Sequence, residues 1–178
     1  MTIMLLDEGM DTGDIILQGK TAIDLEENAS MLHDRLSIFG AELLGKALDV
    51  LGSGGWYPIP QDNQKATFAH LLKKEDGQIN WNFSAETIFN QIRGMTPWPG
   101  CFTRLNKKIL KIHKAKILDT KKQAAPSQII SVSGDGIEVS TGKGTLLLKE
   151  IQLEGKKRMA AEDFIKGHKL ESGTVLGE

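Results

Sequence analysis

The chain has 178 residues, 40% of them hydrophobic and 25% charged, which is the balance of an ordinary soluble globular protein with one domain or two small ones. No apolar run reaches the roughly 20 residues that a membrane span needs, and no basic-then-apolar leader opens the chain, so we expect a cytoplasmic protein without a membrane partner. The single cysteine, Cys101, excludes an internal disulfide and a cysteine-rich zinc site.

The net charge of −1 conceals two halves of opposite sign. Residues 1–72 hold four Lys and Arg against eleven Asp and Glu, a net charge of −7. Residues 73–178 hold the remaining 18 basic and 12 acidic residues, a net charge of +6. This asymmetry suggests two units with different partners, one of them polyanionic.

The chain opens with the apolar run TIMLL, the turn-prone loop DEGMDTGD and the apolar run IILQGKTAI, which together predict strand, loop, strand. A helix is expected next, with Ser30 as its N-cap and the glycines of GSGG as its stop. Its apolar residues recur at helical spacing: Leu32, Leu36, Phe39, Leu43, Ala47 and Leu51.

Residues 55–73 contain two of the five prolines and no regular period, so they predict an extended linker between domains. Ser84 is then expected to cap a short helix that ends at Gly94. Five short β-prone runs follow from Cys101, joined in part by the hairpin turns SGDG and TGKG. Five closely spaced strands favour a small antiparallel barrel of the oligonucleotide-binding (OB) kind, with Trp98 at its base and a short terminal helix.

The Asp-Thr-Gly of the first loop allows three interpretations. A dimeric aspartic protease pairs two such aspartates, but here Asp14 follows where a small residue is expected, and Asp7 and Glu8 add further negative charge. Asp11 and Asp14 are otherwise ordinary turn residues. The third interpretation is a ligand site, because α/β folds bind ligands in loops at strand ends. The four histidines lack metal-ligand spacing, so we expect no metal site.

Basic residues gather in the stretch TRLNKKILKIHKAKILDTKK and again in GKKRM. In a regular strand side chains alternate, so Lys111 and His113 are predicted on one face and Lys114 and Lys116 on the other. Lysines on an exposed strand edge also protect against aggregation. Two basic clusters nevertheless favour contacts with the phosphates of a folded RNA, and the scarcity of aromatic residues argues against stacking on single-stranded bases.

Four segments resemble methionyl-tRNA formyltransferases. Thr2 to Asp14 is similar to the family's TIM-x-x-D-x-G-x-DTGD loop, and KKEDGQINW (73–81) to the start of its carboxy-terminal domain. IRGMTPWPGCFT (92–103) resembles its proline-tryptophan segment, and GDGIEVSTGKGTLLLKEIQLEGKKRMAAEDFIKG (134–167) its barrel and last helix. Related folate-dependent formyltransferase domains share DTGD, but the later segments favour the tRNA enzyme.

The resemblance implies an α/β remnant of a Rossmann-like formyltransferase domain, βαβ-like, followed by an OB-like antiparallel β-barrel, α+β overall. It implies that residues 1–54 belong to the catalytic domain, 55–73 to the linker and 74–178 to a tRNA-binding domain. The implied reaction transfers a formyl group from 10-formyltetrahydrofolate, the co-substrate, to the amino group of methionyl initiator tRNA.

The resemblance also implies roles for particular residues. Asp11 matches the family's catalytic Asp, and the pterin of the folate lies against Leu6, Asp7, Glu8, Gly9 and Met10. The expected tRNA contacts come from the segment 104–122 and from neighbouring basic residues: Lys73, Lys74, Arg104, Lys107, Lys108, Lys111, Lys114, Lys116, Lys121, Lys122, Lys156, Lys157 and Arg158.

Two motifs of the family, Asn-x-His and SLLP, occur nowhere in these 178 residues. In the family they belong to the first half of the catalytic domain, which is therefore the expected missing partner. We expect the chain by itself not to catalyse formyl transfer. A non-catalytic RNA-binding module is the alternative function, and a natural short protein and a truncated one remain equally open.

Overall fold

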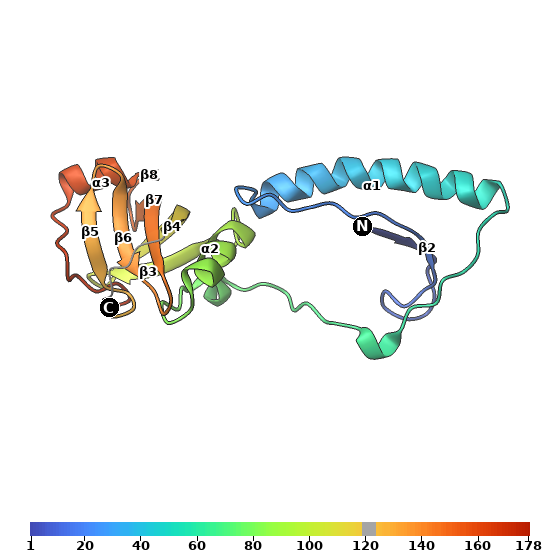
Figure 1. Ribbon diagram of the computed structural model, residues 1–178, viewed down its shortest axis with the longest axis horizontal. Helices are drawn as coiled ribbons and strands as arrows, with labels where there is room; N and C mark the ends of the chain where they lie inside the picture. Colours follow the sequence, from blue (N-terminus) through green and yellow to red (C-terminus); the bar gives the residue numbers. More distant parts are fainter. Residues whose placement is uncertain (119–123) are drawn as a thin grey trace. The chain divides into compact units, whose positions relative to one another are not determined.

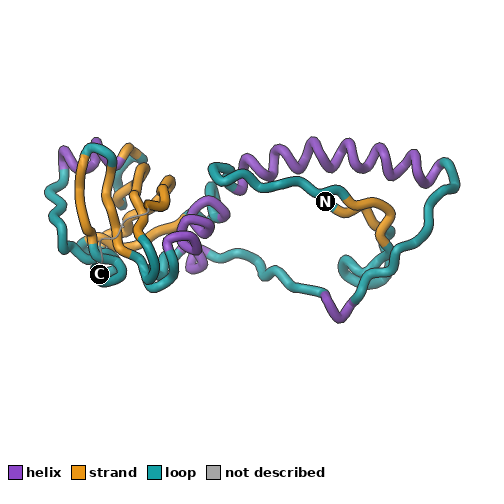
Figure 2. The backbone as a smooth tube through the Cα atoms, viewed as in Figure 1, coloured by secondary structure: helices purple, strands orange, loops and turns teal. Residues whose placement is uncertain are grey.

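The computed structural model describes residues 1–118 and 124–178, and the chain divides into two compact units, Met1–Leu71 and Leu72–Glu178 (Figure 1). The first unit consists mainly of one long helix and loops, whereas the second is rich in strands (Figure 2). In the part of the chain that the structure describes, no helix is long and apolar enough to cross a membrane.

The first unit pairs two short strands, and a helix follows them. β1 (Thr2–Met4) and β2 (Ile15–Gln18) run antiparallel, with Ile3 opposite Leu17. α1 (Ala29–Gly52) and one 3-10 turn, η1 (Asn63–Lys65), come later. The order is therefore β-β-α, and the expected βαβ-like arrangement is wrong. Antiparallel strands need no crossover helix, because the intervening loop simply turns the chain back.

Helix α1 presents the predicted apolar stripe to the strands: Leu43 and Ala47 are buried, and Phe39 is half-buried. A Cβ on Gly19, directly after β2, would lie 2.4 Å from the ring of Phe39, so glycine at this position lets the helix approach without displacing that ring. The helix begins earlier than predicted.

Its N-cap is Asn28, whose Oδ1 accepts a hydrogen bond from the backbone N–H of Met31 at 3.0 Å. Asn is as good an N-cap residue as Ser, and Asn28 precedes Ser30 in the sequence. Because the helix begins after Asn28, Ser30 falls inside it. The predicted stop is confirmed, since α1 ends at Gly52 and Gly54 follows with a φ of +70°.

The second unit is one antiparallel sheet with two helices. The strands pair in the order β3-β4-β7-β6-β5, and β8 adds to β7. The elements in chain order are η2 (Lys74–Gly77), α2 (Ala85–Gly94), β3 (Cys101–Leu105), β4 (Lys108–Leu118), β5 (Ile129–Ser133), β6 (Gly136–Ser140), β7 (Thr145–Leu153), β8 (Met159–Ala160) and α3 (Ala161–Gly167). The five expected strands are confirmed, and so is Ser84 as the cap of α2, because its Oγ accepts from the N–H of Thr87.

A closed barrel is not found: among the described residues β3 and β5 end the strand order without pairing to each other. The core of the unit forms where α2 and α3 contact the sheet, and it includes Ile88, Ile151 and Phe164. The prediction for Trp98 is wrong, since its side chain is 56% exposed. Trp81 is the buried tryptophan, and its Nε1 donates to the Thr103 hydroxyl at 3.0 Å.

Candidate functional site

The Asp-Thr-Gly motif lies in the loop 5–14 between β1 and β2, which we call the Asp11 loop. Asp11 adopts a φ of +57°, a left-handed conformation that Asp tolerates better than most residues. The side chain of Asp11 is exposed, and its carboxylate makes no hydrogen bond to another described residue. Gly13 is buried, and a Cβ there would lie 1.9 Å from the carbonyl oxygen of Leu5, so only glycine fits. The loop thus presents the exposed carboxylate of Asp11 on a tightly constrained backbone.

Asp7 and Asp14 hold the loop in different ways, one through its carboxylate and one through its backbone. The Oδ1 of Asp7 accepts hydrogen bonds from the N–H of Gly9 at 3.0 Å and the hydroxyl of Thr12 at 2.7 Å, so Asp7 braces the loop. The backbone oxygen of Asp14 accepts from the N–H of Leu5 and closes the loop at its base. Of the residues predicted to contact folate, Leu6 is 91% and Met10 is 87% exposed. Apolar side chains therefore stand open in the same loop as Asp11.

One contact to this loop was not foreseen. Gln61, assigned from the sequence to the linker, donates hydrogen bonds from its side-chain amide to backbone carbonyls of the Asp11 loop. No local pattern signals this, because the partners are 48 and 50 residues apart in the chain.

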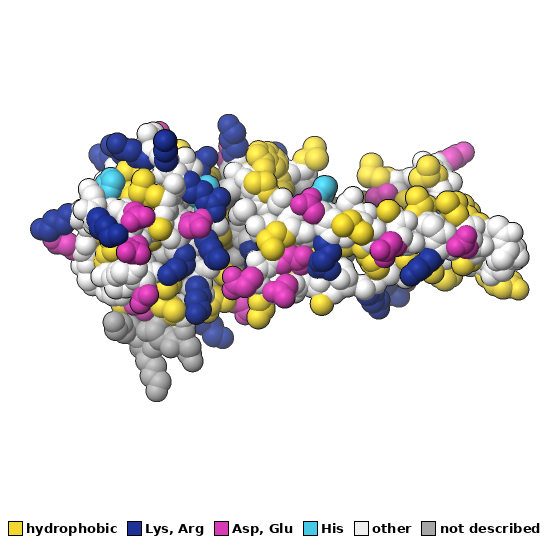
Figure 3. All heavy atoms as spheres, turned by 90° about the horizontal axis from the view of Figure 1, so that it is seen from above, with side chains coloured by type: hydrophobic (Ala, Val, Ile, Leu, Met, Phe, Trp, Pro, Cys, Tyr) yellow, Lys and Arg dark blue, Asp and Glu magenta, His cyan; other side chains and the backbone are white. Residues whose placement is uncertain are grey.

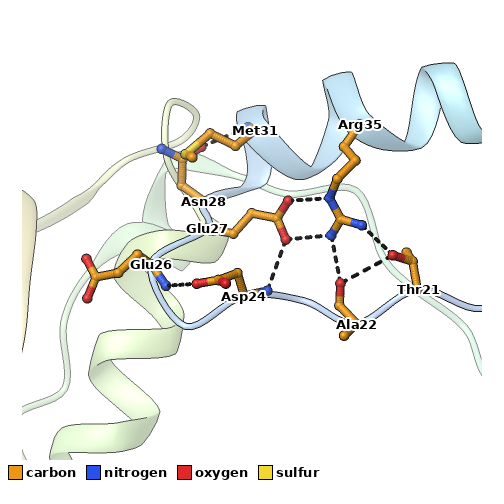
Figure 4. Close-up of polar contacts among 8 residues, drawn as sticks. All are labelled: Thr21, Ala22, Asp24, Glu26, Glu27, Asn28, Met31 and Arg35. Carbon is orange, nitrogen blue, oxygen red and sulfur yellow. Dashed lines mark hydrogen bonds and ion pairs between the residues drawn. The ribbon is translucent and has the colours of Figure 1, made fainter.

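A second polar network fixes the segment between β2 and α1 (Figure 4). The guanidinium of Arg35 on α1 donates from Nε and Nη2 to the two carboxylate oxygens of the buried Glu27, each at 2.8 Å, and from Nη2 to the carbonyl of Ala22 at 2.7 Å. Glu27 also accepts from the N–H of Asp24. The hydrogen bond with Glu27 raises the pKa of Arg35. This network is structural, since it uses both carboxylate oxygens internally.

Three lysines of β4, Lys111, Lys114 and Lys116, share one face, contrary to the sequence-based expectation. Both β4 and its neighbour β7 carry an extra residue, His113 and Lys149, that interrupts the pairing. The interruption at His113 shifts the alternation along β4 by one residue, and the one at Lys149 does the same along β7. Lys111, Lys114 and Lys116 therefore stand opposite Gln152, Glu150 and Leu147 in β7, and all three lysines are exposed. We call this exposed row the lysine face.

The loop after β7 extends the basic surface. Lys156, Lys157 and Arg158 are exposed, and Arg158 Nε donates to Glu150 at 2.8 Å. Lys and Arg side chains lie over the strand-rich unit with acidic side chains among them (Figure 3). Phosphate contacts on this surface would therefore compete with internal ion pairs.

Gln152 connects this loop to β4. Its Nε2 donates to the carbonyl of Lys156 at 2.9 Å, and its Oε1 lies 3.1 Å from Nε2 of His113. Because Gln152 offers an acceptor, the ring of His113 must carry its proton on Nε2. Burial lowers the pKa of His113, and the nearby charges of Arg158 and Lys111 lower it further.

The other predicted tRNA contacts lie at two places. Lys73 and Lys74 are exposed at the start of η2, and Arg104, Lys107 and Lys108 lie in and beside the turn between β3 and β4. Lys121 and Lys122 fall outside the described residues. Among the residues that the structure describes, no three His, Cys, Asp or Glu side chains group in a way that could hold a metal ion.

The two units match two parts of one family. Residues 71–169, more than half of the chain, match the family model of the formyl transferase C-terminal domain, and residues 1–48 match the formyl transferase model. The chain therefore belongs to the formyl transferase family, which replaces the aspartic protease interpretation of Asp-Thr-Gly.

Curated relatives named methionyl-tRNA formyltransferase align with the whole chain. The protein of Citrifermentans bemidjiense is 46% identical over all 178 residues, which cover 55% of that relative. The protein of Bacillus velezensis is 43% identical over 179 aligned positions, which cover all of this chain and 56% of the relative. The chain thus spans about half the length of the curated relatives it matches.

Solved structures share the fold at low identity. HypX from Aquifex aeolicus in complex with tetrahydrofolic acid matches with a TM-score of 0.65 at 15% identity, over 97% of this chain and 33% of that one. The N-formyltransferase from Helicobacter canadensis, in complex with folinic acid and dTDP-3-aminofucose, matches with a TM-score of 0.63 at 20% identity, over 89% and 55%.

Proposed function

We propose that the chain is the carboxy-terminal portion of a methionyl-tRNA formyltransferase, which transfers a formyl group from 10-formyltetrahydrofolate to the amino group of methionyl initiator tRNA. The observation that carries this proposal is the alignment of relatives of that name with every residue of the chain, at up to 46% identity. The folate ligands of the two solved neighbours support a folate formyl donor. A cytoplasmic location remains a prediction of the sequence.

The two units divide the work. Residues 1–54 contribute to the catalytic domain, residues 55–73 join the domains, and residues 74–178 bind tRNA. The antiparallel strand order of the second unit supports an OB-like scaffold. The lysine face, the loop Lys156–Arg158 and the remaining basic residues supply the phosphate contacts, because sequence-independent contacts to a nucleic acid backbone use exposed Lys and Arg.

Asp11 carries the catalytic role that belongs to this chain. The methionyl amine attacks the formyl carbon, a tetrahedral oxyanion forms, and the amine must lose a proton; collapse of the intermediate then breaks the bond from the formyl carbon to the folate nitrogen, which takes up a proton as tetrahydrofolate leaves. In the family an Asn and a His stabilise the oxyanion, and the Asp orients that His or accepts the proton. The exposed Asp11 carboxylate, without an internal partner among the described residues, is free to do either. The open apolar side chains of Leu6 and Met10 suit the flat ring of a pterin.

A chimeric enzyme tests the proposal. The stretch of the Citrifermentans bemidjiense relative that matches this chain is replaced by the 178 residues, and formylation of methionyl initiator tRNA is measured. We expect turnover by the chimera and none by the 178-residue chain alone. In the chimera, Asp11→Asn should lower kcat by about 100-fold or more, whereas Asp14→Asn in the same loop should have little effect. A folded chimera without turnover, or equal losses in both variants, would contradict the proposal.

A further inference from the structure

The segment that follows α1 makes polar contacts with the start of β2 and with the Asp11 loop before it. The N–H of Ile15 donates to the carbonyl of Ile59 at 2.9 Å, and Trp56 Nε1 lies 3.5 Å from the carbonyl of Ile15. Apolar burial does not hold this segment, because Tyr57 is 82% and Ile59 is 55% exposed. Within residues 57–71 only Gln61 is not exposed. Gln61 falls outside both stretches matched by the family models, residues 1–48 and 71–169.

The side-chain amide of Gln61 joins both sides of Thr12. Its Nε2 donates to the carbonyl of Asp11 at 2.9 Å and to the carbonyl of Gly13 at 2.7 Å, and it lies 3.6 Å from the sulfur of Met4. An amide NH2 group has two N–H donors and so serves two carbonyls at once. A carboxylate in the same place has no hydrogen-bond donor and could serve neither carbonyl.

These two hydrogen bonds hold the backbone beside Asp11, whose left-handed conformation is unfavourable for a residue other than glycine. Asp11 holds a φ of +57°, and a residue other than glycine leaves that region unless its surroundings hold it there. Asp7 braces the loop from within through Gly9 and Thr12. The carbonyls of Asp11 and Gly13 are held from outside, by Gln61.

We propose that Gln61 is a positioning residue that fixes the backbone on both sides of Thr12 and so keeps the carboxylate of Asp11 turned out of the loop toward substrate. The catalytic part of this inference rests on the proposed function. The hydrogen bonds themselves do not, so the two parts are tested separately.

Hydrogen exchange in the 178-residue chain tests whether the two hydrogen bonds from Gln61 hold the Asp11 loop. In Gln61→Ala, the amide of Leu5, which donates to Asp14, should exchange at least about tenfold faster, while the amides around Leu43 in α1 should stay unchanged. Gln64→Ala is the matched control, because Gln64 is an exposed glutamine of the same segment. Equal exchange at Leu5 in the two variants would show that Gln61 does not hold the loop.

Gln61→Glu adds a pH signature that a general loss of packing does not produce. At neutral pH the introduced carboxylate repels both carbonyls, so exchange at Leu5 should be at least as fast as in Gln61→Ala. Protection should partly return as the pH falls toward the ordinary carboxyl pKa of about 4, because the protonated group donates one hydrogen bond. The same pH dependence in Gln61→Ala and Gln61→Glu would overturn the assignment of Gln61 as the donor.

Kinetics of the chimera test the positioning role. Gln61→Ala should lower kcat by about tenfold with little change in the KM for tRNA, because the lysine face is untouched. A kcat equal to that of Gln64→Ala would overturn the positioning role and leave the proposed function standing. An inactive parent chimera would instead refute the proposed function, and the exchange experiment would still decide whether Gln61 holds the loop.

Discussion

At the scale of single residues, burial shifts the pKa of two side chains of the second unit, Cys101 and His113. Cys101 on β3 is only 1% exposed, and burial raises the pKa of its thiol to about 12. His113 is half-buried on β4, and burial lowers the pKa of its imidazole. In both cases the neutral form is favoured, so neither side chain is a ready nucleophile or cation in the folded protein.

The first prediction concerns Cys101. In the native chain its reaction with a thiol reagent at pH 8 should be roughly 1,000-fold slower than that of a free cysteine, because both access and the thiolate fraction are reduced. Reaction should accelerate through the urea transition of the second unit. Following released chromophore against urea concentration checks this, and fast labelling without urea would contradict the burial of Cys101.

The second prediction concerns His113. Its folded pKa is lower than its ordinary value, so the unfolded chain takes up a proton more readily than the folded chain. His113 should therefore leave the second unit stable above about pH 6.5 and destabilise it progressively as the pH falls from there through the folded pKa. Urea unfolding between pH 5 and pH 8 measures this slope.

The variant His113→Gln should flatten that slope, since glutamine does not titrate. Gln152, Glu150, Arg158 and Lys111 remain around the site in both proteins, so the comparison isolates the imidazole. His33→Gln on the first unit is the control and should leave the unfolding of the second unit as in the parent. Identical slopes for the parent and His113→Gln would contradict the prediction.

At the scale of elements, the N-cap of α1 is Asn28 and not the predicted Ser30. Asn28 Oδ1 accepts from the N–H of Met31, whereas Ser30 lies exposed within the helix. Asn28→Ala should lower the free energy of unfolding of the first unit by about 1 kcal/mol, and Ser30→Ala should change it little. Urea unfolding followed by the helical circular dichroism signal measures both, and a larger loss in Ser30→Ala would contradict the assignment.

The interruption of β4 at His113 places Lys111, Lys114 and Lys116 together on the lysine face. If Lys114 and Lys116 contact phosphates, the double substitution Lys114→Ala/Lys116→Ala should reduce the slope of log affinity for tRNA against log salt by about 2. The control Lys166→Ala/Lys169→Ala removes the same charge from lysines that pair with Glu162, Asp163 and Glu171. Equal salt slopes in the two double variants would show that only net charge matters.

At the scale of the whole molecule, the two units differ in the size of their cores. In the first unit only three apolar side chains are buried, namely Ile16, Leu43 and Ala47. Among its described residues, the second unit buries a cluster of twenty apolar residues between its sheet and helices. Free energy from burial scales with the apolar area removed from water, so the second unit is the more stable one.

Limited proteolysis should therefore cut the first unit first. We expect early cleavage within residues 1–71 and a resistant fragment that contains residues from 74 to the carboxy terminus, identified by mass spectrometry. In the chimera the first unit should be more resistant, if the rest of the catalytic domain packs against it. Early cleavage within β4 to β7, or simultaneous loss of both units, would contradict this order.

The sequence by itself determined what depends on local pattern. Alternation and glycine turns located the five strands, the serine before an apolar stripe located the start of α2, and the motifs around Asp11 and in the last hundred residues identified the family. These features follow from residues within a few positions of one another. The placement of Asp11 in a loop between two strands also follows from local sequence pattern.

Only the tertiary structure decided which residues meet across the chain. The shared face of Lys111, Lys114 and Lys116 depends on the interruption at His113, where β4 pairs with the distant strand β7, and a shift of one residue reverses every side chain that follows. The burial of Trp81 instead of Trp98, and the hydrogen bonds of Gln61 to the Asp11 loop, depend in the same way on packing between distant segments. The hydrophobic periodicity of the sequence does not predict such contacts, because they arise from the geometry of the folded chain.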